Sequence, residues 1–161
     1  ISIGLMHRKE IIAGATYNPI LNEFFWAHKG SGSWINNQRL RVSNRDKFEG
    51  SVFATGIQIK HTDILDRCVS QVSHMLKKAS IRIMGSAALD LAHVASGKFD
   101  GFWVSRLNIW DIAAGIILIK EAGGVCLNIE GKEFNPLKDE VLVASSSAIS
   151  NQLLKNLQIF T

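Results

Sequence analysis

Two hydrophobic patterns follow one another along the chain. Up to about residue 58, short apolar or partly alternating runs are separated by turn residues, which is typical of β-strands. Strands are expected at 1–8, 11–17, 23–28, 33–35 and 51–57. The connecting turns are short and contain Asn, Gly and Pro, so these strands are expected to form an antiparallel meander.

Beyond about residue 60, helical periods alternate with short strands. Helices are expected at 61–78, 86–96, 109–122 and 147–157, and strands at 81–84, 99–104, 125–128 and 141–144. One face of the first helix carries Ile64, Leu65, Cys68, Val72, Met75 and Leu76. This helix is expected to pack between the two halves of the chain. In the second helix, the expected inward positions are Ala87, Leu91, Val94 and Ala95.

The alternation of strands and helices predicts a sheet covered on both faces by helices. The expected fold class is therefore α/β, a layered α+β sandwich in which an antiparallel sheet precedes a mixed α/β sheet. Two domains are expected. Residues 1–60 would be the remainder of an antiparallel-sheet domain, and residues 61–161 a carboxyl-terminal α/β domain.

Composition places the chain among ordinary globular proteins. Its 161 residues are 47% hydrophobic and 20% charged, which argues against disorder. No apolar run approaches the roughly 18 residues that cross a bilayer, and the first residues do not resemble a signal peptide. Cys68 and Cys126 make neither a disulfide framework nor a zinc site. A reduced, cytoplasmic protein without a membrane partner is expected.

The chain carries a formal charge of +4, and much of it lies between residues 29 and 47. A nucleic-acid patch and a solvated surface that can meet an acidic partner are the two explanations. Nucleic-acid binding is helped by interleaved stacking aromatics, and only Trp34 is available in this stretch. The solvated surface is therefore favoured, and nucleic acid is not an expected partner.

Asp111 is the main candidate for chemistry. Asn108 can cap a helix at its amino terminus, which places Asp111 in the first turn of a helix that is apolar on nearly every side. A carboxylate held at the mouth of a buried helix can ligate a hard cation such as Mg²⁺. An Asp at this position is also favourable against the helix dipole without any metal, and spacing alone favours that explanation.

The second candidate site is the junction Gly85–Ser86–Ala87. Gly85 ends a strand and Ser86 can cap the next helix, whose free N–H groups can bind anions or hydroxyls. An ordinary strand-to-helix turn explains the same residues. Asp90 and Asp100 are weaker candidate ligands, because Asp90 is better explained as a polar helix position and Asp100 as a turn residue.

Several segments resemble the inositol monophosphatase family. The pair of motifs at Trp110–Gly115 (WDIAAG) and Glu121–Gly124 (EAGG) resembles its carboxyl-terminal signature. Gly85–Trp103 resembles the stretch before that signature, and Gly14–Ser43 resembles the hairpins after the family's first metal motif. The resemblance covers essentially the whole chain.

The resemblance implies hydrolysis of a sugar or inositol monophosphate to the free alcohol and phosphate by a water activated on Mg²⁺. It implies that Asp111 is a metal ligand and catalytic residue in contact with substrate, and that the backbone at Gly85, Ser86 and Ala87 contacts substrate hydroxyls. Members of the family are commonly homodimers and are often inhibited by lithium, so a homodimer is expected.

The chain departs from the family pattern in two ways. The family's acidic glutamate pair and its DPIDGT-like loop, which supply the other metal ligands, do not occur in residues 1–161. The chain is therefore expected to begin just after that loop and to be inactive on its own. Val104 stands where inositol-specific members carry a substrate-contacting glutamate, and valine accepts no hydrogen bond. Another sugar phosphate or a nucleotide-derived phosphate is thus a possible substrate.

A binding role is the alternative to catalysis, because some bacterial relatives associate with transcription machinery. The acidic loop distinguishes the two hypotheses: a natural chain that contains it favours the enzyme. A basic nucleic-acid binder is a third hypothesis, which the salt dependence of binding would test.

Overall fold

The computed structural model describes residues 1–160, whose strands form two five-stranded sheets. The first sheet is an antiparallel meander in the order β1-β2-β3-β4-β5. Its strands are β1 (Ser2–His7), β2 (Glu10–Asn18), β3 (Glu23–His28), β4 (Ser33–Ile35) and β5 (Gln38–Arg39). The meander expected from the turn residues is confirmed.

The second sheet is mixed and has the order β7-β6-β8-β10-β9. Its strands are β6 (Val52–Gly56), β7 (Ser80–Arg82), β8 (Gly101–Ser105), β9 (Gly124–Leu127) and β10 (Val141–Ser146). Strand β6 runs parallel to β7 and β8, whereas β10 is antiparallel to β8 and β9.

The strand expected at 51–57 belongs to the second sheet, so its expected place in the meander is wrong. Phe53, Ala54 and Thr55 are buried in succession. A strand that is buried on both faces suits the middle of a parallel sheet covered by helices, whereas a meander with one open face alternates. The predicted division into domains near residue 60 stays a prediction.

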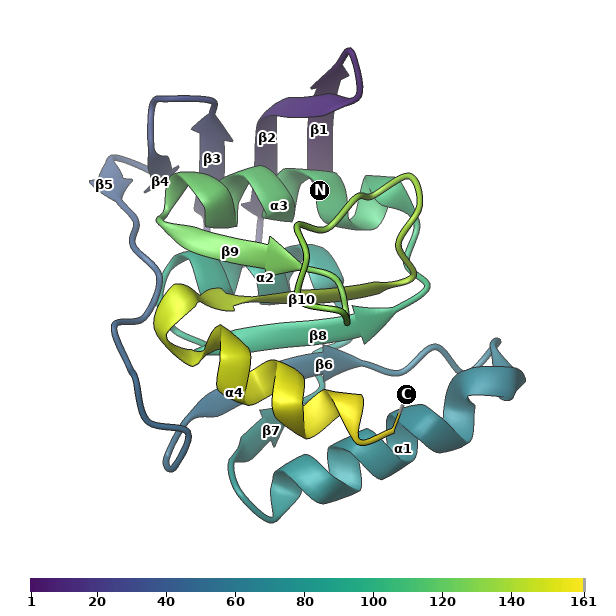
Figure 1. Cartoon of the computed structure of the whole chain (residues 1–161). Coiled ribbons are helices and arrows are strands. Elements are labelled where there is room, and N and C mark those ends of the chain that lie inside the picture. Colours follow the sequence, from purple (N-terminus) through teal and green to yellow (C-terminus); the bar gives the residue numbers. More distant parts are fainter. Residues whose placement is uncertain (161) are drawn as a thin grey trace.

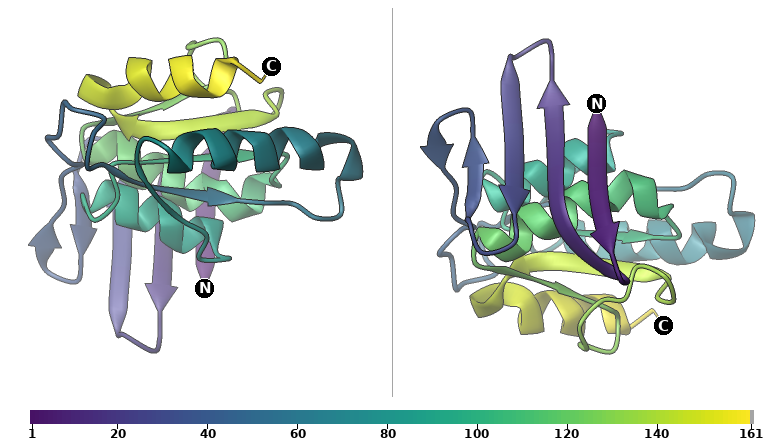
Figure 2. Two further views of the ribbon diagram at one scale, coloured as in Figure 1. Left: turned by 90° about the horizontal axis from the view of Figure 1, so that it is seen from below. Right: turned by 90° about the horizontal axis from the view of Figure 1, so that it is seen from above.

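Four helices lie within residues 1–160: α1 (Thr62–Leu76), α2 (Ala87–Ala95), α3 (Ile109–Glu121) and α4 (Ser147–Gln158). Helices α2 and α3 lie between the two sheets, and α1 and α4 lie on the far side of the second sheet (Figures 1 and 2). The expected layered α/β fold, with helices on both faces of the mixed sheet, is confirmed. None of these helices is long and apolar enough to cross a membrane.

Helix α1 does not pack between the two halves of the chain, which corrects the expectation. It contacts β7 and α4 on the outer side of the second sheet (Figure 1). Helix α1 connects the parallel strands β6 and β7, and such a crossover helix covers a face of the sheet that it joins. The face toward the first sheet is occupied by α2 and α3. Leu76, expected inward, is therefore largely exposed.

Helix α3 forms the centre of the molecule. Every residue from Ile112 to Ile119 is buried, because the first sheet covers one side of the helix and the second sheet and α2 cover the other. The first sheet approaches α3 closely at Gly14, where a Cβ atom would lie 2.6 Å from Cα of Ala114. The absence of a side chain there brings β2 against the helix backbone.

The outer face of the first sheet is apolar and open. Its exposed side chains on β1 and β3 include Ile3, Leu5 and Phe24. Trp26 and Trp34 stack on one another across β3 and β4, with 5.9 Å between their ring centroids. We call this surface the outer face below.

Candidate functional site

A pocket of about 410 Å³ lies at the carboxyl ends of the three parallel strands β6, β7 and β8. Ligands of open α/β sheets characteristically bind at this edge, because the loops that leave the strands converge there. The lining residues are Ser2, Gly56, Ile57, Gln58, Ile83, Gly85, Ser86, Ala87, Ala88, Asp90, Val104, Leu107, Trp110 and Asp111.

The structure brings all four predicted site residues to this one pocket. Gly85, Ser86 and Ala87 lie between β7 and the start of α2, and Asp111 lies in the first turn of α3. Gly85 has φ +79°, and a Cβ atom there would meet nothing within 4 Å, so glycine is required by the backbone bend rather than by crowding. The roles of the four residues stay predictions.

The two helices that begin beside the pocket lack the side-chain capping hydrogen bonds that the sequence indicated. Ser86 and Asn108 occupy the N-cap positions of α2 and α3, but neither side chain makes a capping hydrogen bond, so the expected side-chain caps are wrong. The first N–H groups of a helix have no intrahelical partner and carry a partial positive charge. Two uncapped helix starts therefore face one pocket, which favours binding of an anion or a hydroxyl.

Asp111 is half-buried, and its side chain makes no hydrogen bond or ion pair within residues 1–160. Its backbone N–H bonds to the Asn108 carbonyl, which belongs to the helix start. An Asp in the first turn is favourable against the dipole of α3, yet both carboxylate oxygens of Asp111 remain available to a ligand. Asp111 can therefore supply oxygen donors to a hard cation.

None of the described residues that line the pocket carries a positive charge, and Asp90 and Asp111 are the ionisable ones among them. A cation bound beside Asp111 would offset repulsion between a carboxylate and a phosphate group in this pocket. No group of three or more His, Cys, Asp or Glu within residues 1–160 is placed to hold a metal. The donor set fits part of a metal site, and further ligands would have to come from outside these residues.

Asp90 is the residue that sequence reasoning ranked too low. It was expected to be a polar helix position, but its side chain is buried, with 1% of the residue exposed. Burial alone raises the pKa of its carboxyl group to about 7. The helical period could have located it, because Asp90 lies three residues after Ala87 and four before Val94, on the stripe predicted to face inward.

Asp100 lies in the bend between α2 and β8, in agreement with the expected turn residue, and it does not line the pocket. Its carboxylate accepts hydrogen bonds from the Ser43 hydroxyl at 2.6 Å and from the Val52 N–H at 2.8 Å. Arg45 lies 3.4 Å away from the same carboxylate. These bonds attach the segment that links the two sheets to the start of β8, so the role of Asp100 is structural.

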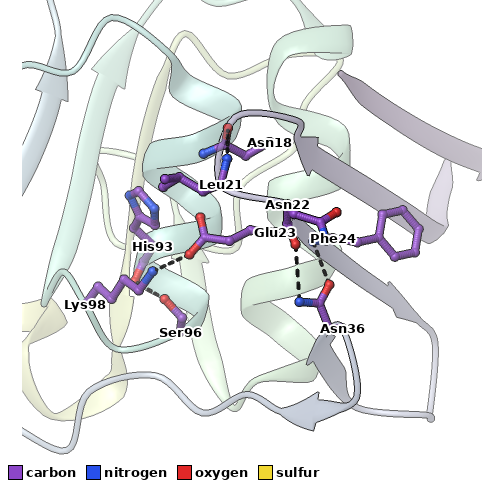
Figure 3. Close-up of polar contacts among 9 residues, drawn as sticks. All are labelled: Asn18, Leu21, Asn22, Glu23, Phe24, Asn36, His93, Ser96 and Lys98. Carbon is purple, nitrogen blue, oxygen red and sulfur yellow. Dashed lines mark hydrogen bonds and ion pairs between the residues drawn. The ribbon is translucent and has the colours of Figure 1, made fainter.

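A second polar cluster joins the first sheet to the end of α2 (Figure 3). Glu23 forms an ion pair with Lys98 at 2.8 Å. The ring of His93 lies edge-on to Phe25 and Phe99, and burial together with the charge of Lys98 lowers its pKa. This packing agrees with a structural histidine rather than a metal ligand.

Comparison with known proteins adds independent information. The sequence model of the inositol monophosphatase family matches residues 1–160. An inositol-1-monophosphatase of Caulobacter vibrioides is 38% identical over 98% of this chain and 63% of its own length. The Nus factor SuhB of Pasteurella multocida is 36% identical over 98% of this chain and 59% of its own length. The chain thus spans about 60% of the length of these curated relatives.

Solved structures agree with the sequence comparison. The extragenic suppressor protein suhB of Bartonella henselae superposes with a TM-score of 0.91 at 39% identity, covering 98% of this chain and 60% of that one. The inositol monophosphatase of Anabaena superposes with a TM-score of 0.93 at 31% identity, covering 98% and 65%. Together with the match along the sequence, these likenesses show that the chain belongs to the inositol monophosphatase family.

Proposed function

We propose that this chain forms part of a Mg²⁺-dependent phosphatase that hydrolyses the monophosphate of a sugar or another polyol. The pocket carries the proposal: two uncapped helix starts and the carboxylate of Asp111 meet at the carboxyl ends of parallel strands. Such a site suits a phosphate only when a cation is present. Names of relatives such as the inositol-1-monophosphatase of Caulobacter vibrioides support the same reaction class.

The residues of this chain would bind and orient the substrate. The N–H groups at the start of α2 would donate hydrogen bonds to phosphate or hydroxyl oxygens, with Gly85 leaving room for close approach. The Asp111 carboxylate would hold the cation at the start of α3. When bound, Mg²⁺ would offset phosphate charge and lower the pKa of a water molecule. The remaining ligands would come from a segment outside these residues.

The alcohol part of the substrate would meet an apolar wall. Val104 lines the pocket and is buried, with 2% of its surface exposed. A valine side chain accepts no hydrogen bond, so inositol 1-phosphate gains no hydrogen bond from it. A substrate other than inositol 1-phosphate is therefore proposed, and a panel of sugar and polyol phosphates would identify it.

Substitution of Asp111 tests the proposal. In the whole protein that contains these residues, we expect Asp111→Asn to lower kcat/KM for a polyol phosphate by roughly 100-fold or more, because the cation loses a charged ligand. Phosphate release would be measured with Mg²⁺ and with a chelator. The matched control is Asp66→Asn on the exposed side of α1, which should leave the rate unchanged.

Two results would contradict the proposal. One is full activity of Asp111→Asn in the presence of Mg²⁺. The other is activity of the wild type that a chelator leaves intact. Residues 1–161 alone should release negligible phosphate, since they bring no group of three acidic, His or Cys side chains together for a metal within the described part.

A role in transcription is the second candidate function. It is favoured by relatives named Nus factor SuhB, such as that of Pasteurella multocida. Such a role would need binding surfaces rather than turnover. If it holds, Asp111→Asn should abolish phosphate release and leave association with purified transcription complexes unchanged. Loss of both properties in a folded variant would argue against a separate binding role.

A further inference from the structure

One buried carboxyl group of the pocket has no partner among the described residues. Asp90 lies on α2, and its Oδ1 atom is inaccessible to solvent and forms no hydrogen bond within residues 1–160. A buried polar atom without a partner carries an unfavourable desolvation cost. Native proteins tolerate such atoms mainly where a ligand or an ordered water completes them.

A second unpaired polar atom lines the same pocket. The hydroxyl of Ser2, on β1, is also inaccessible and has no hydrogen bond within the described part of the chain. Ser2 and Asp90 come from the first sheet and from α2, so two layers each contribute one unpaired polar group. The side chains of Val104 and Leu107, which line the same pocket, are apolar.

We propose that Asp90 is a specificity-determining residue that accepts a hydrogen bond from a hydroxyl group in the alcohol part of the phosphorylated substrate. The Ser2 hydroxyl is the second contact of the same subsite. This inference rests on the proposed phosphatase function and extends it to a class of substrate. Asp90 would then select substrates by hydrogen bonding to a hydroxyl group, which the side chain of Val104 does not do.

The chemistry of the pair explains why a hydroxyl group is the fitting partner. A carboxyl oxygen accepts a hydrogen bond in its ionised and in its protonated form, and a hydroxyl supplies the donor that Asp90 lacks. A phosphate ester whose alcohol has no further hydroxyl would enter the pocket and leave Asp90 unpaired. Sites with a buried hydrogen-bonding group reject substrates that lack its partner.

The test compares two probes in the whole protein. Glycerol 2-phosphate has free hydroxyl groups, whereas 4-nitrophenyl phosphate has none. We expect Asp90→Ala to lower kcat/KM for glycerol 2-phosphate at least about 10-fold relative to wild type, and to change kcat/KM for 4-nitrophenyl phosphate less than about 3-fold. Each variant is compared with wild type on the same substrate, which cancels the different reactivities of the two esters.

Asp90→Asn is the second variant, because its amide keeps an acceptor oxygen and the size of the side chain. It should recover most of the activity on glycerol 2-phosphate that Asp90→Ala loses. A purely structural role would lower the rates on both probes by the same factor. Equal losses on both probes, or no loss on either, would overturn the proposal.

Measurements of probe binding distinguish a failure of this inference from a failure of the proposed phosphatase function. If wild type hydrolyses neither probe, the phosphatase proposal fails, and calorimetry with Mg²⁺ then measures the affinity of each probe. The inference stands if wild type prefers glycerol 2-phosphate and Asp90→Ala removes that preference. It fails if wild type binds both probes equally or binds neither.

Discussion

Single side chains decide the character of the pocket. Asp111 is positioned by the start of α3 and keeps its carboxylate free, whereas Asp90 is buried without a partner. Val104 occupies the same pocket and offers only methyl groups. The two carboxyl groups in this small space therefore differ in environment, and burial raises the pKa of the Asp90 carboxyl group to about 7.

Asp90 gives a prediction about pH and stability. Its pKa is about 7 in the folded chain, whereas an unfolded chain releases this proton near pH 4. Between these values the folded state binds the additional proton, so the free energy of unfolding falls as pH rises, and the loss is complete above about pH 7. Asp90→Asn removes this loss and should stabilise the protein by roughly 2–4 kcal/mol at pH 8, with little change near pH 4.

Urea unfolding of wild type and Asp90→Asn at pH 4, 6 and 8 would measure the effect. The exposed Asp66 on α1 offers the control, and Asp66→Asn should show no such trend. A stabilisation by Asp90→Asn that is equal at pH 4 and pH 8 would show that Asp90 is not protonated by burial.

At the scale of elements, the sequence predicts where helices and strands lie along the chain better than it predicts which strands pair with one another. The helix at 109–122 was predictable because Asn108 and Gly123 bound an apolar run, and α3 covers nearly the same residues. The short strand β5 was missed because Gln38 and Arg39 carry no hydrophobic signal. Strand β6 was found but assigned to the wrong sheet, since its pairing depends on distant strands that a local pattern does not reveal.

The same distinction applies to the candidate site. Asp111 and Gly85 were identified by their motifs, and the carboxyl ends of parallel strands then bring them together. Asp90 was ranked as a weaker candidate because a carboxylate on a helix is usually solvated. Helix α2, which carries Asp90, packs against α3 and the second sheet, and this arrangement is visible only in the assembled layers.

The contact between β2 and α3 gives a prediction at this scale. Gly14→Ala would place a Cβ atom 2.6 Å from the backbone of Ala114, which has no rotamer by which to move away. The sheet must then shift from the helix, and we expect a destabilisation of about 1–3 kcal/mol. Thermal or urea unfolding would measure it.

Gly56→Ala is the matched control, since the added Cβ atom would meet Val104 at an ordinary distance of 3.4 Å. Its effect on the free energy of unfolding should stay below about 1 kcal/mol. Equal effects of the two substitutions would mean that β2 does not depend on close contact with α3.

At the scale of the whole molecule, the outer face stands out because it exposes large apolar side chains to solvent. Ile3 is 65% exposed and Leu5 is 56% exposed on the edge strand β1. Monomeric proteins rarely leave a contiguous apolar patch of more than a few hundred Å² uncovered. The exposed Phe24 and the partly buried pair Trp26 and Trp34 extend this surface across β3 and β4.

Residues 1–161 alone should therefore self-associate as their concentration rises, and the double substitution Ile3→Lys with Leu5→Lys should shift them toward the monomer. Sedimentation velocity would measure the change. Val69→Lys on α1 is the control, because Val69 is also exposed but lies on a different surface. A wild-type chain that stays monomeric at every concentration would contradict the prediction, and the homodimer expected from the family resemblance is tested by the same measurement.

The central place of α3 has a consequence for how the molecule comes apart. Helix α3 packs against both sheets. Separation of either sheet from the helix would expose apolar side chains that also pack against the other sheet. Heating should therefore give a single calorimetric transition, with its van't Hoff enthalpy equal to the calorimetric one. Amide protons between residues 112 and 119 should exchange with deuterium only when the entire chain opens, which makes them a direct gauge of its global stability.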